Sequence, residues 1–254
     1  MMSQSVSAIK NELKKIQTED HPQFQEWLKD SRKGVQQAIT QWYRQQEQRK
    51  QERLNYEQML IEEQKLMEQG VDYIAGIDEV GRGPLAGPVV AAAVVLPKDL
   101  ELIGINDSKK LSKMKREYFY KEIMEKADVG IGIITASEID EINIYEATKK
   151  AMQAAVAELS QKPEHLLIDA MKLNIPIPQT SIIKGDAKSV SIAAASIVAK
   201  VTRDRLMCEY AQLYPQYAFE KNMGYGTTEH LAGLNENGPC QIHRKSFSPI
   251  KEMK

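Results

Sequence analysis

Four carboxylates of this chain lie beside apolar segments, where a single buried carboxylate is costly. Asp78 and Glu79 follow one apolar stretch, and Asp169 closes another. Asp186 stands just before a long segment of helical composition. A buried acid needs a partner, and a divalent cation is a natural one. Because no pair of His or Cys lies near these acids, the set favours an oxygen-preferring ion, Mg²⁺ or Mn²⁺, over zinc.

Such a set of acids suits the hydrolysis of a phosphodiester. The reaction needs a more acidic attacking water and a stabilised leaving 3′ oxygen, and two divalent ions about 4 Å apart can supply both. Each ion keeps open positions for water and phosphate, so carboxylates from separate segments have to converge. Each acid also has an ordinary alternative: Asp186 fits a helix cap, and Asp169 fits a buried acceptor for backbone amides. The joint occurrence of the four favours the metal site.

A glycine-flanked arginine follows the first acid pair. Adjacent strand residues point to opposite faces, so Asp78 and Glu79 can serve one site only if the chain begins to turn there. Gly81 and Gly83 supply that turn and let the backbone approach a ligand closely. The alternative is an ordinary turn with a solvated Arg82. The glycine spacing matches neither the Walker lysine motif nor the dinucleotide fingerprint, so it gives little support to nucleotide binding.

The elements that must position these residues alternate between strand and helix from Val71 onward. The pattern predicts strands over Tyr73–Ile77, Gly87–Leu96, Gly130–Thr135, Leu166–Asp169 and Ser181–Lys184. It predicts helices over Lys113–Lys126, Tyr145–Ser160, Ser189 to about Leu213, and from about Thr228. Strands that come first in a run and later alternate with helices indicate an α/β domain with a mixed sheet flanked by helices.

The first seventy residues differ in composition from the rest, being rich in Gln and in charges of both signs. We therefore expect a helical N-terminal extension, residues 1–70, and a main α/β domain, residues 71–254. Such a composition makes helices with little to bury. We expect two or three helices, one starting at His21-Pro22, that pack on the main domain or on a partner. Polar residues at heptad positions argue against a long coiled coil.

The charges of the chain nearly cancel, with 34 Lys plus Arg against 35 Asp plus Glu and a formal net charge of −1. This balance excludes a basic nucleic-acid coat and a disordered polyelectrolyte, so any polyanion must be held by local positive charge. The two cysteines, Cys208 and Cys240, suit a reducing compartment. No signal pattern or membrane-spanning run is visible, so we expect a cytoplasmic protein that needs no membrane.

Five blocks of the sequence closely resemble bacterial ribonuclease HII. They are GIDEVGRGPLAGPVVAAAV (Gly76–Val94), NDSKKLS (Asn106–Ser112), LLIDA (Leu166–Ala170), KGDAKSVSIAAASIVAKVTRD (Lys184–Asp204) and GYGTTEH (Gly224–His230). The resemblance covers about residues 71–248 in consistent order. It implies a ribonuclease H-like fold with helical C-terminal elements. It also implies an endonuclease that cuts RNA in RNA–DNA hybrids and incises 5′ to single ribonucleotides in duplex DNA, leaving 3′-hydroxyl and 5′-phosphate ends, as in ribonucleotide excision repair.

The resemblance also implies roles for individual residues. Asp78, Glu79, Asp169 and Asp186 would bind the Mn²⁺ or Mg²⁺ ions. The Gly81-Arg82-Gly83 loop would read the ribose 2′-hydroxyl, which separates RNA from DNA, and would hold the adjacent phosphate. Tyr225 would stack on the deoxyribose that follows, although packing into a core is the commoner fate of a tyrosine.

Local positive charge must provide the rest of substrate binding. Ser108, Lys109 and Lys184 complete the predicted substrate contacts, whereas Lys110 and Lys245 also fit solvated surface charges. We further expect phosphate contacts from the basic C-terminal third, which holds Arg203, Arg205, His243, Arg244 and Lys245. For His230 and His243 we expect structural or phosphate-contact roles rather than proton transfer.

Two other functional classes stay open. Ribonuclease HIII shares the implied fold and hybrid cleavage, but the Gly-Arg-Gly loop and the lack of a strand-rich N-terminal region speak against it. A non-catalytic hybrid-binding module is the other, and the presence of all four acids speaks against that. We expect a monomer whose N-terminal helices add modestly to hybrid affinity, through Lys10, Lys14, Lys15, Lys29, Arg32 and Lys33. Those helices could instead dock on a repair or replication protein, or shield a sheet edge.

Overall fold

The structure is a computed structural model that describes residues 4–253. By compactness the chain divides into two units, one up to Asn55 and one from Tyr56. The division falls within a long helix, α3 (Lys33–Met59), ahead of the change in composition near Gly70. Within residues 4–253, no helix is both long and apolar enough to cross a membrane.

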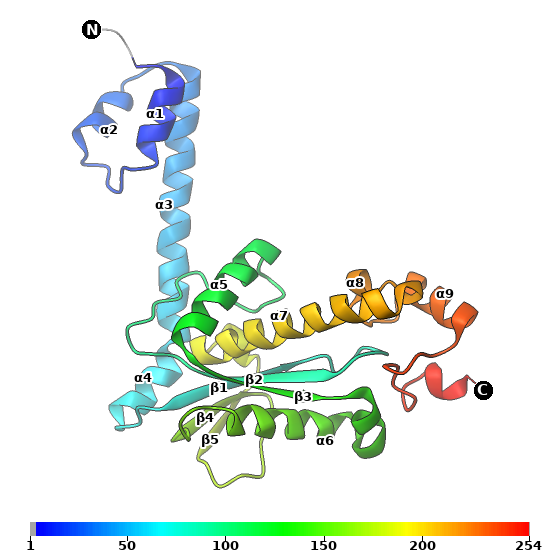
Figure 1. Cartoon of the computed structure of the whole chain (residues 1–254). Coiled ribbons are helices and arrows are strands. Elements are labelled where there is room, and N and C mark those ends of the chain that lie inside the picture. The colour runs from blue at the N-terminus through cyan, green and yellow to red at the C-terminus, as the bar shows by residue number, and fades with distance from the viewer. Residues whose placement is uncertain (1–3, 254) are drawn as a thin grey trace. The chain divides into compact units, whose positions relative to one another are not determined.

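The N-terminal unit has an apolar core of its own. Its helices are α1 (Val6–Leu13), α2 (Pro22–Trp27) and the first part of α3, which lie side by side in Figure 1. Phe24 and Trp42 pack with their ring centroids 4.4 Å apart inside this core. The expectation of helices with little to bury is therefore wrong, because one apolar face of each helix is enough to build a small core.

The number of helices before the first strand also differs from the expectation. With α4 (Ile61–Glu68), four helices precede that strand in the described part of the chain. The predicted start at His21-Pro22 is confirmed, since α2 begins at Pro22. A proline is tolerated there because the first helical turn has no use for its missing N–H.

The unit from Tyr56 is built on one five-stranded sheet of order β3-β2-β1-β4-β5, and the predicted mixed sheet is confirmed. The strands are β1 (Ile74–Val80), β2 (Val89–Val95), β3 (Asp128–Ile134), β4 (His165–Asp169) and β5 (Gln179–Ile182). The neighbours β1–β2 and β2–β3 are antiparallel, whereas β1–β4 and β4–β5 are parallel.

The helices that follow β2 in this unit largely keep to the predicted ranges. They are α5 (Lys113–Lys126), α6 (Ala136–Ala157), α7 (Val190–Leu213), α8 (Phe219–Asn222) and α9 (Thr228–Asn237), with 3₁₀ turns η1 (Gly185–Ala187), η2 (Pro215–Tyr217) and η3 (Ile250–Glu252). Only α6 begins well before its predicted start. Asn143, at φ 67°, interrupts that helix, so the predicted start at Tyr145 marks its second part.

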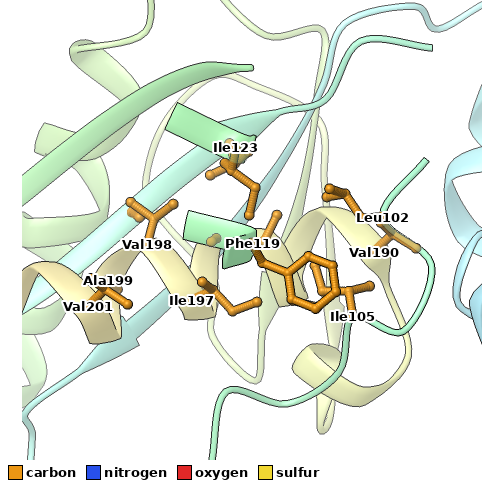
Figure 2. Packing of buried hydrophobic residues seen from close by; sticks show 14 of the residues in the cluster. Leu102, Ile105, Phe119, Ile123, Val190, Ile197, Val198, Ala199 and Val201 are labelled. Atoms are coloured by element: carbon orange, nitrogen blue, oxygen red, sulfur yellow. The ribbon is translucent and has the colours of Figure 1, made fainter. Parts of the chain in front are cut away.

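Different helices cover the two faces of the sheet (Figure 1). On one face, Val90 and Ala92 of β2 pack with α5 and α7; on the other, Val89 and Ala91 pack with α6. The strand is thus buried on both faces, which explains its unbroken run of Val and Ala. Figure 2 shows part of the first cluster, in which Phe119 of α5 lies close to the residues of α7.

The helix α7 lies unusually close to β1. A Cβ atom added at Gly76, in the middle of β1, would collide with the backbone of Ser191 near the start of α7. Only glycine permits this approach, because any side chain would push the helix away from the sheet. The close packing brings α7 alongside the end of β1, where the first two carboxylates stand.

Candidate active site

One cavity of about 400 Å³ gathers all the predicted site residues except Lys184. It is lined by Asp78, Glu79, Gly81, Arg82, Gly83, Ser108, Lys109, Asp169, Asp186 and Tyr225, together with Val80, Ser196 and Lys200. The convergence follows from topology: β1 and β4 are parallel neighbours, so their carboxyl ends meet at one edge of the sheet. Lys184 is exposed beside η1 and does not line the cavity.

Asp78 and Glu79 still belong to β1, which stays paired with β2 as far as Val80. The expectation that the chain turns at these two acids is therefore wrong. Both reach the same cavity because β4 pairs with β1 only up to Ile77, which leaves the last residues of β1 open on that side. The turn comes at Gly81, whose φ of +94° favours glycine.

Asp169 and Asp186 are linked through the 3₁₀ turn that follows β5. Oδ1 of Asp169 accepts the backbone N–H of Gly185 at 2.7 Å, which ties the end of β4 to η1 and to Asp186 within it. Asp186 does not cap α7, because Ser189 does so by accepting the N–H of Ile192. The capping alternative for Asp186 is thus wrong, whereas Asp169 is an amide acceptor through one of its oxygens.

Burial and repulsion act together on the acid pair of β1. Asp78 is 5% exposed, and burial, followed by the charge of Glu79, raises its pKa well above the usual value. The pKa of Glu79 is raised chiefly by burial. The guanidinium of Arg82, whose Nη1 lies 3.6 Å from Oε1 of Glu79, acts in the opposite direction. As it stands, the pair resists carrying two negative charges.

The donor chemistry of the cavity fits a divalent cation. Oε2 of Glu79 is buried without a hydrogen-bond partner, and the four acids offer the oxygen ligands that hard ions prefer. A cation would also relieve the burial and repulsion that raise the pKa of Asp78 and Glu79. Within residues 4–253, however, no three His, Cys, Asp or Glu side chains form a group that could hold an ion as they stand. The metal ligands therefore stay a prediction.

Tyr225 lies opposite the glycine-rich loop. Its side chain is 46% exposed, and a Cβ atom added at Gly83 would lie 3.7 Å from Cε1 of its ring. The alternative of a tyrosine packed in the core is therefore wrong. The ring and the loop both line the cavity.

Three residues near the acids were missed by the sequence analysis. Ser196 and Lys200 line the cavity from α7, and their four-residue spacing was the available signal that they share a helix face. A hydrogen bond from Ser196 partly offsets the raised pKa of Asp78. Asp107 stands next to Ser108, and after burial its charge is the largest cause of the raised pKa of Asp186.

Only some of the basic side chains in the C-terminal third of the chain lie at the surface. Arg203 and Arg244 are fully buried, so the expectation that they contact phosphates is wrong. His230 and His243 are also buried, and their Nε2 atoms lie 2.9 Å apart, which agrees with the structural role expected for them. Arg205, by contrast, is exposed and pairs with Glu117 at 2.7 Å.

Comparison with known proteins gives matches over nearly the whole chain. Residues 75–250 match the family model Ribonuclease HII, and residues 5–67 match the model Ribonuclease HII N-terminal domain. The chain is 58% identical, over its full length and 99% of the relative, to a ribonuclease HII from Bacillus cereus (strain G9842).

Solved structures give the same fold. Ribonuclease H2 from Pyrococcus horikoshii OT3 is 29% identical and matches with a TM-score of 0.60 over 70% of this chain and 95% of that one. Bst-RNase HIII in complex with Mn²⁺ is 19% identical and matches with a TM-score of 0.55 over 71% of this chain and 68% of that one. The second likeness shows the fold alone.

The expected ribonuclease H-like fold, with its mixed sheet and helical N-terminal region, is confirmed by these structures. The two family models cover the five motif blocks and also the N-terminal helices, which no motif had explained. The type HII match also decides against the ribonuclease HIII and binding-module alternatives. The chain therefore belongs to the ribonuclease HII family, and it is a type HII ribonuclease H, an endoribonuclease that acts on RNA–DNA hybrids.

Proposed function

We propose that this enzyme, besides cleaving the RNA strand of hybrids, incises on the 5′ side of single ribonucleotides in duplex DNA and leaves 3′-hydroxyl and 5′-phosphate ends. The observation that carries the proposal is a single cavity that joins the four carboxylates to the Gly81-Arg82-Gly83 loop and Tyr225. The acids suit the hydrolysis, and the loop and the tyrosine suit the choice of the bond to be cut.

Asp78, Glu79, Asp169 and Asp186 would hold two divalent ions, Mg²⁺ or Mn²⁺. When bound, such ions make the attacking water more acidic and stabilise the leaving 3′ oxygen. Support comes from the all-oxygen donor set and from the buried, unpartnered Oε2 of Glu79. A structural neighbour, Bst-RNase HIII, was solved with Mn²⁺.

Three cations of the chain line the same cavity and would hold the phosphodiester backbone. They are Arg82, Lys109 and Lys200. Contacts from such side chains to phosphates position a duplex without reading its sequence, as a repair enzyme requires. Lys184 lies outside the cavity, so we assign it at most a contact with a more distant phosphate.

The backbone of Gly81-Arg82-Gly83 would read the 2′-hydroxyl, which is both donor and acceptor and marks RNA against DNA. Tyr225 would stack on the deoxyribose that follows the ribonucleotide. The exposed ring and its place opposite Gly83 support this role. Together the two elements would recognise an RNA-to-DNA junction.

The N-terminal extension, residues 1–70, would add modestly to hybrid affinity. Lys10 and Lys14 line a groove of about 220 Å³ with Gln41 and Gln45, and none of the described residues that line it is acidic. Such a surface suits phosphate groups. The alternative is a docking site for a repair or replication protein. We further expect a cytoplasmic monomer that takes part in ribonucleotide excision repair.

Cleavage assays test the main proposal. A labelled DNA duplex with one ribonucleotide and a continuous RNA–DNA hybrid are incubated with enzyme and Mg²⁺ or Mn²⁺, with Asp78→Asn as the control. We expect incision of both substrates, 5′ to the lone ribonucleotide, and none by the variant. Cleavage of the hybrid alone would overturn the assignment of junction recognition.

A further inference from the structure

Two buried arginines join the loops that face the substrate. We propose that Arg203 and Arg244 are positioning residues that hold the Gly81–Gly83 loop and the loop that carries Tyr225, residues 223–227, as one rigid unit, and that this unit sets the preference for a ribonucleotide followed by DNA. The inference rests on the proposed function, because it concerns how the same cavity selects its substrate.

Arg244 orients the glycine-rich loop. Its Nη1 donates to the carbonyl of Arg82 at 2.9 Å, its Nη2 donates to that of Gly81, and its Nε donates to that of Gly87 at 3.0 Å. In a trans peptide the C=O and the following N–H lie in one plane and point opposite ways. Arg244 therefore turns the N–H groups of Arg82 and Gly83 away from itself, which fixes the donors that would meet a ribose hydroxyl.

Arg203 joins the segment that follows this loop, at Ala86 and Pro88, to the loop that carries Tyr225. Its Nε donates to the carbonyl of Pro88 at 2.9 Å, its Nη2 to that of Ala86 at 3.1 Å, and its Nη1 to that of Met223 at 2.9 Å. The N–H of Leu85 also donates to the carbonyl of Gly224 at 2.8 Å. Segments far apart in sequence are thus held by one guanidinium group.

The side chain of Arg203 also packs closely against Gly81. A Cβ atom added at Gly81 would collide with the side chain of Arg203, so the turn after the acid pair rests directly on the arginine. A displacement of Arg203 would therefore move both the turn and the loop that carries Tyr225.

The backbone of Tyr225 has a second support. Cys240 donates its N–H to Nδ1 of His243 at 2.9 Å, and His243 Nε2 lies 2.9 Å from His230 Nε2. Nδ1 of His230 lies 2.9 Å from the carbonyl of Tyr225. With both rings neutral, each of these three hydrogen bonds has one donor and one acceptor. The last of them ends on the carbonyl of Tyr225, the residue that would stack on the sugar.

Packing alone does not explain two buried guanidinium groups. Both side chains are fully buried, and their guanidinium groups donate to backbone carbonyls. Burying a charge is costly, and each of these guanidinium groups offsets the cost only by donating to several backbone carbonyls at once. The forked, planar donors of arginine hold several carbonyls at once, which a lysine cannot do.

The test uses Arg244→Lys and Arg203→Lys in the full chain, with Arg49→Lys, at an exposed position of α3, as the matched control. For each protein, kcat/KM is measured on the single-ribonucleotide duplex and on a continuous hybrid. We expect the kcat/KM on the single-ribonucleotide duplex, divided by that on the hybrid, to fall about tenfold or more in the first two variants. The reason is that a small misplacement of the groups that bind a substrate lowers the rate of reaction strongly. The control should keep the wild-type ratio.

The ratio separates positioning from a general loss of structure. A merely destabilised enzyme would lose activity on both substrates equally, and that result for both variants would overturn the inference. Tyr225→Ala combined with Arg244→Lys should lower the ratio no further than the larger single effect, since both act through one unit. If the two substitutions lowered the ratio independently and additively, Arg244 and Tyr225 would not act through one unit.

The same assay tests cleavage at a lone ribonucleotide separately from the role of the two arginines. Wild-type enzyme that never cuts at a lone ribonucleotide would overturn both. Wild-type enzyme that does so, with Arg244→Lys and Arg203→Lys retaining the wild-type ratio, would overturn only the role of the arginines. Should one variant not fold, His230→Gln provides a further disturbance of the Tyr225 carbonyl.

Discussion

The carboxylate of Glu63 on α4 accepts the hydroxyl of Ser189 at 2.6 Å, at the first turn of α7. The same oxygen accepts the backbone N–H of Ser191 at 2.9 Å. Glu63 is 3% exposed, so an acid from before the first strand satisfies polar groups at the buried start of the helix that lines the active-site cavity. A negative charge at a helix N-terminus is also favourable by itself.

Removing this contact should destabilise the protein. Glu63→Ala leaves a buried hydroxyl and a buried N–H without their acceptor, and we expect a loss of about 2 kcal/mol in the free energy of unfolding. Urea denaturation of the full chain measures it. The control is Glu62→Ala, which removes only an exposed pair with Lys65 and should change stability by less than about 0.5 kcal/mol. Equal effects of the two changes would contradict the interpretation.

Asp78→Asn should separate activity from stability. The change removes a proposed metal ligand, and we expect activity to fall more than about 100-fold, because bound ions would supply several kcal/mol of stabilisation to the transition state. Without metal, the variant should be more stable than the wild type, since burial and the charge of Glu79 raise the pKa of Asp78 and so oppose its ionised form. Thermal unfolding in EDTA checks the stability. A variant that is active, or less stable without metal, would contradict this account.

The buried histidine pair predicts a dependence of stability on pH. Burial and the neighbouring His230 lower the pKa of His243 from 6.5 to about 4. The unfolded chain therefore takes up this proton first, so the stabilisation is present above pH 6.5 and is lost as the pH falls toward 4. Between pH 7 and pH 5, we expect the wild type to lose about 2 kcal/mol more stability than His243→Gln.

Urea unfolding at the two pH values measures that difference. His21→Gln is the control, because His21 is exposed and lies outside the buried histidine pair. If the free energy of unfolding of His243→Gln fell as much as that of the wild type between the two pH values, His243 would not be the source of the pH dependence.

The lysines of the N-terminal groove should contribute to the salt dependence of hybrid binding. In the double variant Lys10→Gln, Lys14→Gln we expect weaker binding and a slope of log affinity against log salt that is shallower by about one to two, as expected for two lost phosphate contacts. Titrations of a hybrid at several salt concentrations measure the slope, with Lys65→Gln as the control, since Lys65 pairs with Glu62 outside this groove. An unchanged slope would favour the docking alternative.

The sequence by itself determined what depends on short-range patterns. The helix Lys113–Lys126 has its predicted bounds, and α7 begins one residue after the predicted Ser189, which caps it. The four acids and the Gly-Arg-Gly loop were also found from residue type and local context. Such features are readable because helix period, turn residues and apolar runs leave their mark within a few neighbours.

The tertiary structure alone decided which polar residues are buried and what they contact. From the sequence, Arg203 and Arg244 were expected at the surface on phosphates, and they lie inside the protein on loop carbonyls. Likewise, Asp78 and Glu79 reach one cavity because of where β4 stops pairing with β1, and no local turn is involved. A charge belongs to a residue, but its burial and its partners depend on segments far away in the chain, which no local pattern contains.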